Sequence, residues 1–176
     1  MLKVQNDSLD EQLYKAFWYK LQQAKFDIIY YSEHFNRYAN ISRIIKYIIA
    51  GVTVMATGVW MNWGSVPAIA NICSIVILAL QVVSAVSEHF PYESRTLELR
   101  DMLAELNPLY LEMENDWRTI LGLKMSNPKI QEAIHEYELK QEEIKSHYFK
   151  ADALPDNEKI RTKADEKTEE YFKYFV

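Results

Sequence analysis

The feature that most constrains this chain is a pair of apolar stretches separated by a short polar turn. The first stretch covers residues 44–61, and the second covers residues 66–86 and contains no charged side chain. A transmembrane helix needs about 20 mostly apolar residues to cross about 30 Å of hydrocarbon, and each stretch approaches that length, the first when residues 41–43 are counted as its interfacial end. The sequence therefore predicts a two-helix transmembrane hairpin, which we place at residues 41–88.

The alternative is a buried hairpin within a soluble helical bundle. We prefer the transmembrane interpretation because a buried helix of a soluble protein rarely runs this far without a charged residue that faces water. Trp60 and Trp63 lie at the tip of the hairpin, where amphipathic rings favour the membrane–water interface. At the other end, Arg43 and Lys46 lie near the start of the first span, where the stem of Lys46 can carry its ammonium group to the lipid headgroups. We predict these four residues as interface anchors.

Basic residues flank the hairpin on the side of the chain termini. They are Arg37, Arg43, Lys46, Arg95 and Arg100, and the tip contains none. The positive-inside rule therefore predicts that both termini lie in the cytoplasm and the tip lies outside. The formal net charge of −5 gives no electrostatic support for a nucleic-acid partner.

The N-terminal part, residues 1–40, is predicted to be a cytosolic helix that continues into the first span. Ser8 and Glu11 have the spacing of a capping box, and neither Gly nor Pro occurs between this box and Gly51. Apolar residues recur at spacings of three and four throughout. We predict one helix from Leu9 to Met61.

One face of this N-terminal helix is rich in aromatic residues. They are Phe17, Trp18, Phe26, Tyr30, Tyr31 and Phe35. Such a face either lies on the bilayer surface or packs against other helices. We prefer packing, because Asp27 and Glu33 would lie badly against anionic headgroups.

Residues 89–176 are predicted to form a cytosolic helical domain. A helix is expected from Tyr92 through a kink at Pro108 to Gly122. The next helix is expected to be capped by Asn127 and to reach about Lys150, and a last one to be capped by Asp156. The predicted fold is thus all-α: an integral membrane protein with a transmembrane hairpin and a cytosolic bundle of long helices.

Motifs for catalysis or metal binding are missing from the sequence. The best metal candidate is Glu132-x-x-His135, but a second such motif is lacking, so we interpret it as a solvated helix face. His34, His89 and His147 are isolated and are expected at the surface. We predict neither an enzyme nor a cofactor.

The informative polar residues lie inside the apolar stretches. Asn71, Ser74 and Gln81 share one face of the second predicted span, and Thr53 and Thr57 form a similar face on the first. Amides exposed to lipid are costly, so the Asn71 face should meet protein or water. Either several copies surround a pore that these residues line, or the amides hold helices together; both roles fit the sequence. A pore requires a homo-oligomer, since one hairpin cannot enclose a conduit.

This architecture resembles the SLATT family of small two-span bacterial membrane effectors. The resemblance consists of the long N-terminal helix, the two spans with an uncharged turn, the Phe90-Pro91 exit, and the following helix with Leu97, Arg100 and Leu103. It implies a pore-forming effector in the bacterial inner membrane that permeabilises the membrane of an infected cell in a nucleotide-signal defence system. A separate nucleotide-sensing or regulatory protein would be a partner.

Two other functions are compatible with the pattern. The first is a non-conducting membrane anchor or scaffold that carries a cytosolic helical interaction domain. The second is a phage-type holin, which fits the small size but has no need for the long flanking helices.

Overall fold

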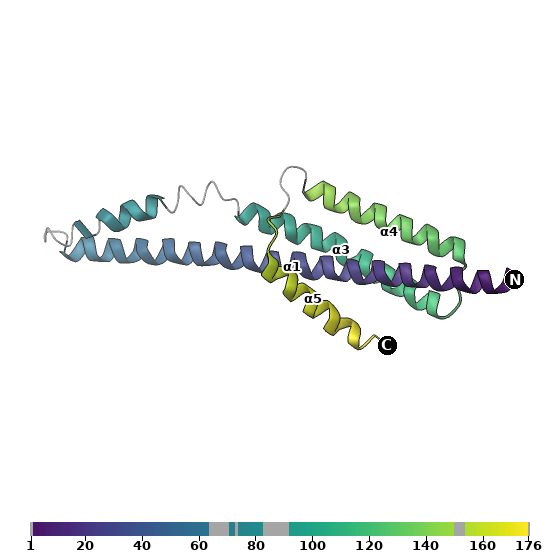
Figure 1. Cartoon of the computed structure of the whole chain (residues 1–176). Helices are drawn as coiled ribbons and strands as arrows, with labels where there is room; N and C mark the ends of the chain where they lie inside the picture. Colours follow the sequence, from purple (N-terminus) through teal and green to yellow (C-terminus); the bar gives the residue numbers. More distant parts are fainter. Residues whose placement is uncertain (1, 64–70, 73, 83–91, 150–153, 176) are drawn as a thin grey trace. The chain divides into compact units, whose positions relative to one another are not determined.

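The computed structural model describes residues 2–63, 71–72, 74–82, 92–149 and 154–175 (Figure 1). Within these ranges every regular element is an α-helix, so the predicted all-α class is confirmed. The helices are α1 (Leu2–Trp63), α3 (Tyr92–Leu121), α4 (Asn127–Tyr148) and α5 (Glu158–Lys173). Residues 71–72 and 74–82 are also helical.

A membrane-crossing helix is not found among the described residues: none there is both long and apolar enough. The second predicted span, residues 66–86, lies partly outside the described residues.

The longest element, α1, has 62 residues and contains the helix that the sequence predicts from Leu9 to Met61. The predicted start is wrong, because the helix begins at Leu2 and runs through Ser8, which therefore cannot cap it. Residues 2–8 contain neither Gly nor Pro, so nothing in them stops the helix from extending toward the N-terminus.

The third helix continues through Pro108 and ends next to Gly122, as the sequence predicts. The backbone N–H of Lys124 donates to the carbonyl of Thr119, and that of Leu123 donates to the carbonyl of Ile120. This pair of bonds is a Schellman motif. Its left-handed position is occupied by Leu123, with φ of 53°, and not by the neighbouring glycine.

Both predicted N-caps in this part of the chain are wrong by one residue. Ser126 is the N-cap residue of α4 in place of Asn127, with extended backbone angles and no hydrogen bond from its side chain to the helix end, and Pro128 lies in the first turn. Asn157 caps α5 in place of Asp156, and its side-chain oxygen accepts from the backbone N–H of Ile160 at 3.2 Å. Asx side chains at adjacent positions make such a choice invisible in the sequence.

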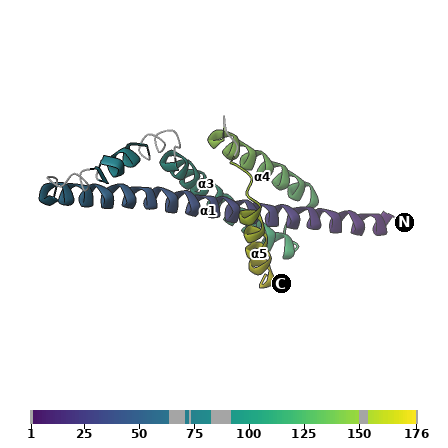
Figure 2. The same cartoon turned by 60° about the vertical axis from the view of Figure 1, so that its left-hand side comes forward.

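The chain divides into two compact units, and α1 contributes to both. Unit 1 comprises Met1–His34 and Glu98–Val176, and unit 2 comprises Phe35–Leu97. Unit 1 contains all the buried residues of the described part of the chain. It is built from the N-terminal part of α1, most of α3, α4 and α5 (Figures 1 and 2).

The aromatic face of α1 packs against the other helices of unit 1, as preferred from the sequence. Phe17 is fully buried and stacks on Trp117 of α3 at 6.0 Å between ring centroids. The same ring meets Tyr137 of α4 edge-on at 6.3 Å. Trp18 contacts Phe172 of α5 at 5.0 Å. One stripe of α1 therefore joins all three partner helices of the unit.

The two acidic residues that argued against lipid contact are held in ion pairs within unit 1. Asp27 lies 2.7 Å from the ammonium group of Lys145 on α4. Glu33 receives Lys163 at 2.7 Å and Lys167 at 2.5 Å, both from α5. These pairs fix α4 and α5 on the same helix that carries the aromatic stripe.

The prediction that His34 lies at the surface is wrong. His34 is only 1% exposed, and its ring meets Tyr30 edge-on at 4.6 Å. It continues the apolar stripe of α1 one turn after Tyr30, and this spacing is what buries it. His147 is exposed as predicted, whereas His89 lies outside the described residues.

Candidate functional site

Unit 2 displays large apolar side chains that the structure leaves in the open. On α1 the exposed ones are Ile44, Tyr47, Ile48 and Val54, and on the helix of residues 71–82 they are Ile72, Ile75, Ile77, Leu78 and Val82. Within the described part of unit 2, no residue is buried. An exposed apolar surface on this scale marks a site that contacts lipid or another protein.

The predicted polar residues of the second apolar stretch lie on this surface. Asn71, Ser74 and Gln81 are all exposed and share one helical face with Leu78. Among the described residues, the structure shows no hydrogen bond to the side-chain amide of Asn71 or of Gln81. Each amide thus keeps its donors and its acceptor available for a further partner.

The polar residues predicted on the first stretch behave differently. The hydroxyl of Thr53 donates to the carbonyl of Ile49 at 2.7 Å, one turn earlier in α1. That bond meets the needs of the hydroxyl donor inside the helix, so Thr53 can face lipid at little cost. Thr57, Trp60 and Trp63 belong to α1, but their side chains lie outside the described part of the structure.

The basic residues predicted as anchors lie on the part of α1 that belongs to unit 2, and both are exposed. Arg43 is exposed, and the ammonium group of Lys46 lies 3.0 Å from the carboxylate of Glu93 on α3. Tyr38 and Tyr92 meet nearby at 5.9 Å between centroids. This ion pair joins the first turn of α3 to α1 within unit 2.

A second group of functional interest lies in unit 1 and was not recognised in the sequence. The ammonium group of Lys25 sits 3.8 Å from the ring centre of Tyr171 on α5 and 4.7 Å from that of Tyr110 on α3. Burial lowers the pKa of this lysine, and the nearby Glu114 carboxylate opposes the shift. Its position four residues after the buried Leu21 was a signal that Lys25 lies on the apolar stripe.

The residues around Lys25 also contact one another. Tyr171 donates a hydrogen bond to Glu114 at 3.2 Å, and Glu114 also pairs with Arg118. Burial raises the pKa of Tyr110. These contacts join α1, α3 and α5. The charge of Lys25 lies against two tyrosine rings, and the charge of Glu114 is paired with Arg118.

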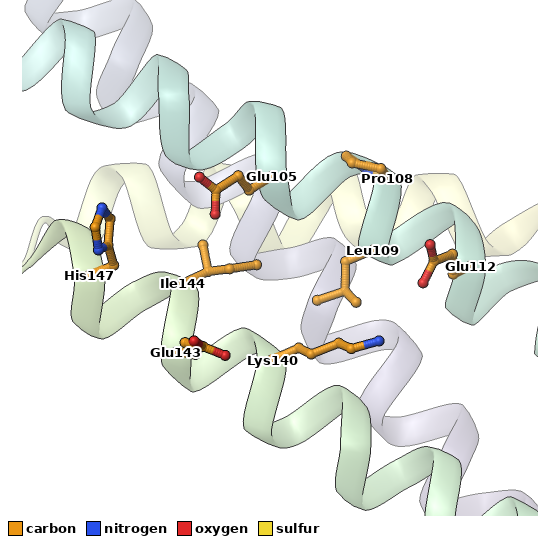
Figure 3. A pocket seen from close by; sticks show the side chains of 8 residues that line it. All are labelled: Glu105, Pro108, Leu109, Glu112, Lys140, Glu143, Ile144 and His147. Atoms are coloured by element: carbon orange, nitrogen blue, oxygen red, sulfur yellow. The ribbon is translucent and has the colours of Figure 1, made fainter.

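A groove of about 500 Å³ lies between α3 and α4 (Figure 3). Its apolar floor includes Leu109 and Ile144, and Pro108 lies beside it. Acidic, basic and imidazole side chains form the rim: Glu105, Glu112, Lys140, Glu143 and His147.

Two of the charged rim residues are held by contacts with neighbouring side chains. Lys140 pairs with Glu136 at 2.7 Å, and Glu105 accepts from the hydroxyl of Tyr148 at 2.7 Å, which raises the pKa of Tyr148 to about 12. Among the described residues no group of acidic, histidine or cysteine side chains is arranged to hold a metal ion. Glu132 and His135, the candidate ligands from the sequence, are both exposed on α4, as expected for a solvated face.

Comparison of the chain with family models, with curated proteins and with solved structures gives no match.

Proposed function

We propose that this protein is a homo-oligomeric membrane effector whose unit 2 enters the bilayer as a two-helix hairpin. Copies assemble into a pore that permeabilises the bacterial inner membrane, with both termini cytoplasmic. The resemblance to the SLATT family assigns this activity to antiviral defence, with a separate nucleotide-sensing or regulatory protein as its trigger. The observation that carries the membrane part is the set of exposed apolar side chains in unit 2.

The composition of that surface favours lipid over a soluble partner. Between Lys46 and Glu88 the sequence contains no charged residue, whereas interfaces between soluble proteins carry a charged or polar rim. Charged residues are frequent again at the surface of unit 1. In a two-helix hairpin, Lys46 and Glu88 fall at the cytoplasmic boundary of the hydrocarbon layer, and the uncharged turn with Trp60 and Trp63 falls at the other boundary.

The neutral amides of Asn71 and Gln81 support a conducting assembly. They are polar enough to wet a narrow pore and carry no charge that would block ions of either sign. A non-conducting anchor for unit 1 remains the competing function, because the same amides also hold helices together.

The membrane part is tested with two leucines of nearly equal exposure. Leu78 in unit 2 is 64% exposed and Leu111 in unit 1 is 63% exposed. An arginine near the centre of a bilayer costs about 2.5–3.5 kcal/mol by insertion measurements, so Leu78→Arg should release the protein from alkali-washed membranes. Leu111→Arg is the matched control and should stay membrane-bound. Equal extraction of both variants would contradict the proposal.

The conducting part is tested with vesicles that contain a trapped dye. Gln81→Leu makes the proposed pore wall apolar and should abolish dye release, because a narrow apolar constriction excludes water. Val82→Leu is the control, since it adds the same residue at the next position without removing a polar group. Wild-type protein that integrates into vesicles but releases no dye with the native partner and trigger present would leave only the anchor function.

A further inference from the structure

We infer that the face formed by Asn71, Ser74, Leu78 and Gln81 is the contact through which copies of this chain associate in parallel. Asn71 of one copy lies opposite Asn71 of the next, and Gln81 lies opposite Gln81. This inference rests on the proposed membrane function and names the partner of that site as a second copy of the chain.

The spacing of the four residues is that of a helix–helix seam. The intervals are three, four and three residues, which repeat the a and d positions of a heptad. On a helix that advances 1.5 Å per residue, the two amides lie about 15 Å apart along this seam. Leu78 fills the space between them with an apolar contact, so the amides fix the register of the pair.

The opposite side of the same helix is partly buried. Val76 and Leu80 are the half-buried residues of the described segment 74–82. At about 100° per residue they lie on the side of the helix away from the seam. Val76 and Leu80 are thus partly covered, whereas Asn71, Leu78 and Gln81 on the seam side are exposed and can contact another chain.

The chemistry of the seam selects an identical partner. An amide carries both donors and an acceptor, so two identical amides satisfy each other, unlike two identical charged groups. Copies that enter a membrane with the same orientation are parallel, and a symmetric contact brings like residues together. In a ring of copies, each amide donates to the next one while its remaining polar atoms face the lumen.

Disulfide crosslinking of the full chain in membranes tests the inference. In a Cys73→Ser background, Leu78→Cys and Ser74→Cys should form disulfide-linked dimers with an added oxidant. Val76→Cys and Leu80→Cys are the matched controls on the opposite face and should crosslink at least tenfold more slowly. Equal or faster crosslinking through the control positions, or no crosslinking at Leu78→Cys in a membrane-bound protein, would overturn the seam.

Energy transfer between labelled copies in detergent gives an independent measurement. The double variant Asn71→Leu/Gln81→Leu should weaken association by at least tenfold, whereas Asn71→Gln/Gln81→Asn, which keeps both amides, should retain most of it. Unchanged association of the leucine variant would overturn the role of the amides.

The two proposals fail separately. Dye release by the wild type together with crosslinking only through Val76→Cys or Leu80→Cys overturns the seam and leaves the pore. Crosslinking through Leu78→Cys in a protein that never releases dye supports the seam and overturns conduction.

Discussion

Units 1 and 2 use apolar residues of similar size for opposite purposes. Unit 1 gathers Phe17, Trp117, Tyr137 and Phe172 into one aromatic core, with ion pairs around it. Unit 2 leaves Ile44, Val54, Ile75, Leu78 and Val82 exposed, and none of its described residues is buried. The hydrophobic effect stabilises unit 1 from within, whereas the exposed apolar side chains of unit 2 gain little from burial within the described part of the chain.

The strongest test of this contrast replaces one phenylalanine in each unit. Phe17 is fully buried, whereas Phe35, the first residue of unit 2, is half-buried. Phe17→Ala should lower the free energy of unfolding by about 3–5 kcal/mol, because the cavity lies inside a closed core. Phe35→Ala should cost about 1–2 kcal/mol, since less of its ring is removed from water. Denaturant unfolding in detergent measures both, and equal losses would break the contrast.

The ion pairs of the two units should also differ in how much they contribute to the free energy of unfolding. The side chains of Asp27 and Lys145 are 15% and 20% exposed, whereas those of Lys46 and Glu93 are 62% and 70% exposed. Lys145→Met should destabilise the protein by about 1–3 kcal/mol, because it leaves a mostly buried carboxylate without its cation. Lys46→Met should cost about 0.5 kcal/mol or less.

A double variant sharpens this result. Burial raises the pKa of Asp27 even though Lys145 opposes the shift, so the buried charge is itself unfavourable. Asp27→Leu/Lys145→Met should therefore recover most of the stability lost in the single variant. If the double variant stays as unstable as Lys145→Met, the attraction between the two charges is needed to hold α4 on α1.

We expect that the exposed leucines of unit 1 play no part in membrane binding, and Leu123 provides a test. It adopts the left-handed conformation of the Schellman motif, which costs a residue with a Cβ about 1–2 kcal/mol. Leu123→Gly should therefore stabilise the protein by about 1 kcal/mol, without a change in membrane binding. Leu139→Gly, at an exposed position inside α4, should instead destabilise it by about 1 kcal/mol. If both substitutions changed the stability in the same direction, the left-handed conformation of Leu123 would not explain the effect of Leu123→Gly.

The smallest expected effect concerns the pH dependence of unit 1. Burial opposes the shift, but the hydrogen bonds from Lys163 and Lys167 lower the pKa of Glu33 below its ordinary value of 4.5. A lowered folded-state pKa contributes stability above pH 4.5 that is lost as the pH falls through the folded value. Glu33→Gln should thus be less stable than the wild type at pH 7, by about 1 kcal/mol or less, and should match it in acid. A constant difference between pH 7 and pH 3 would exclude the ion pairs as its cause.

The sequence predicted the helices well because their signals are local. An unbroken period of three and four residues defined α1, and Gly122 marked the end of α3. The predicted caps, Asn127 and Asp156, were each one residue away from the observed N-cap positions, Ser126 and Asn157, because polar residues suited to a helix N-terminus stand side by side there.

The properties that depend on packing could not be predicted. The division between His34 and Phe35 falls inside one continuous helix, where the pattern of residues does not change. The burial of His34 and the position of Lys25 between two tyrosines both depend on residues from distant parts of the chain. The polar face of Asn71 and Gln81 was visible because helical spacing alone places them together.

The contact between two indole rings gives unit 1 an optical signal of its own. The ring centroids of Trp18 and Trp117 lie 5.1 Å apart at an angle of 37°, close enough for their electronic transitions to couple in near-ultraviolet circular dichroism. The other two tryptophans, Trp60 and Trp63, adjoin the polar turn of the apolar hairpin. Replacing these two with Phe would leave tryptophan bands that come only from the core of unit 1. Replacing Trp18 and Trp117 would leave emission that reports the surroundings of the hairpin tip, so the two units can be followed in one protein by light alone.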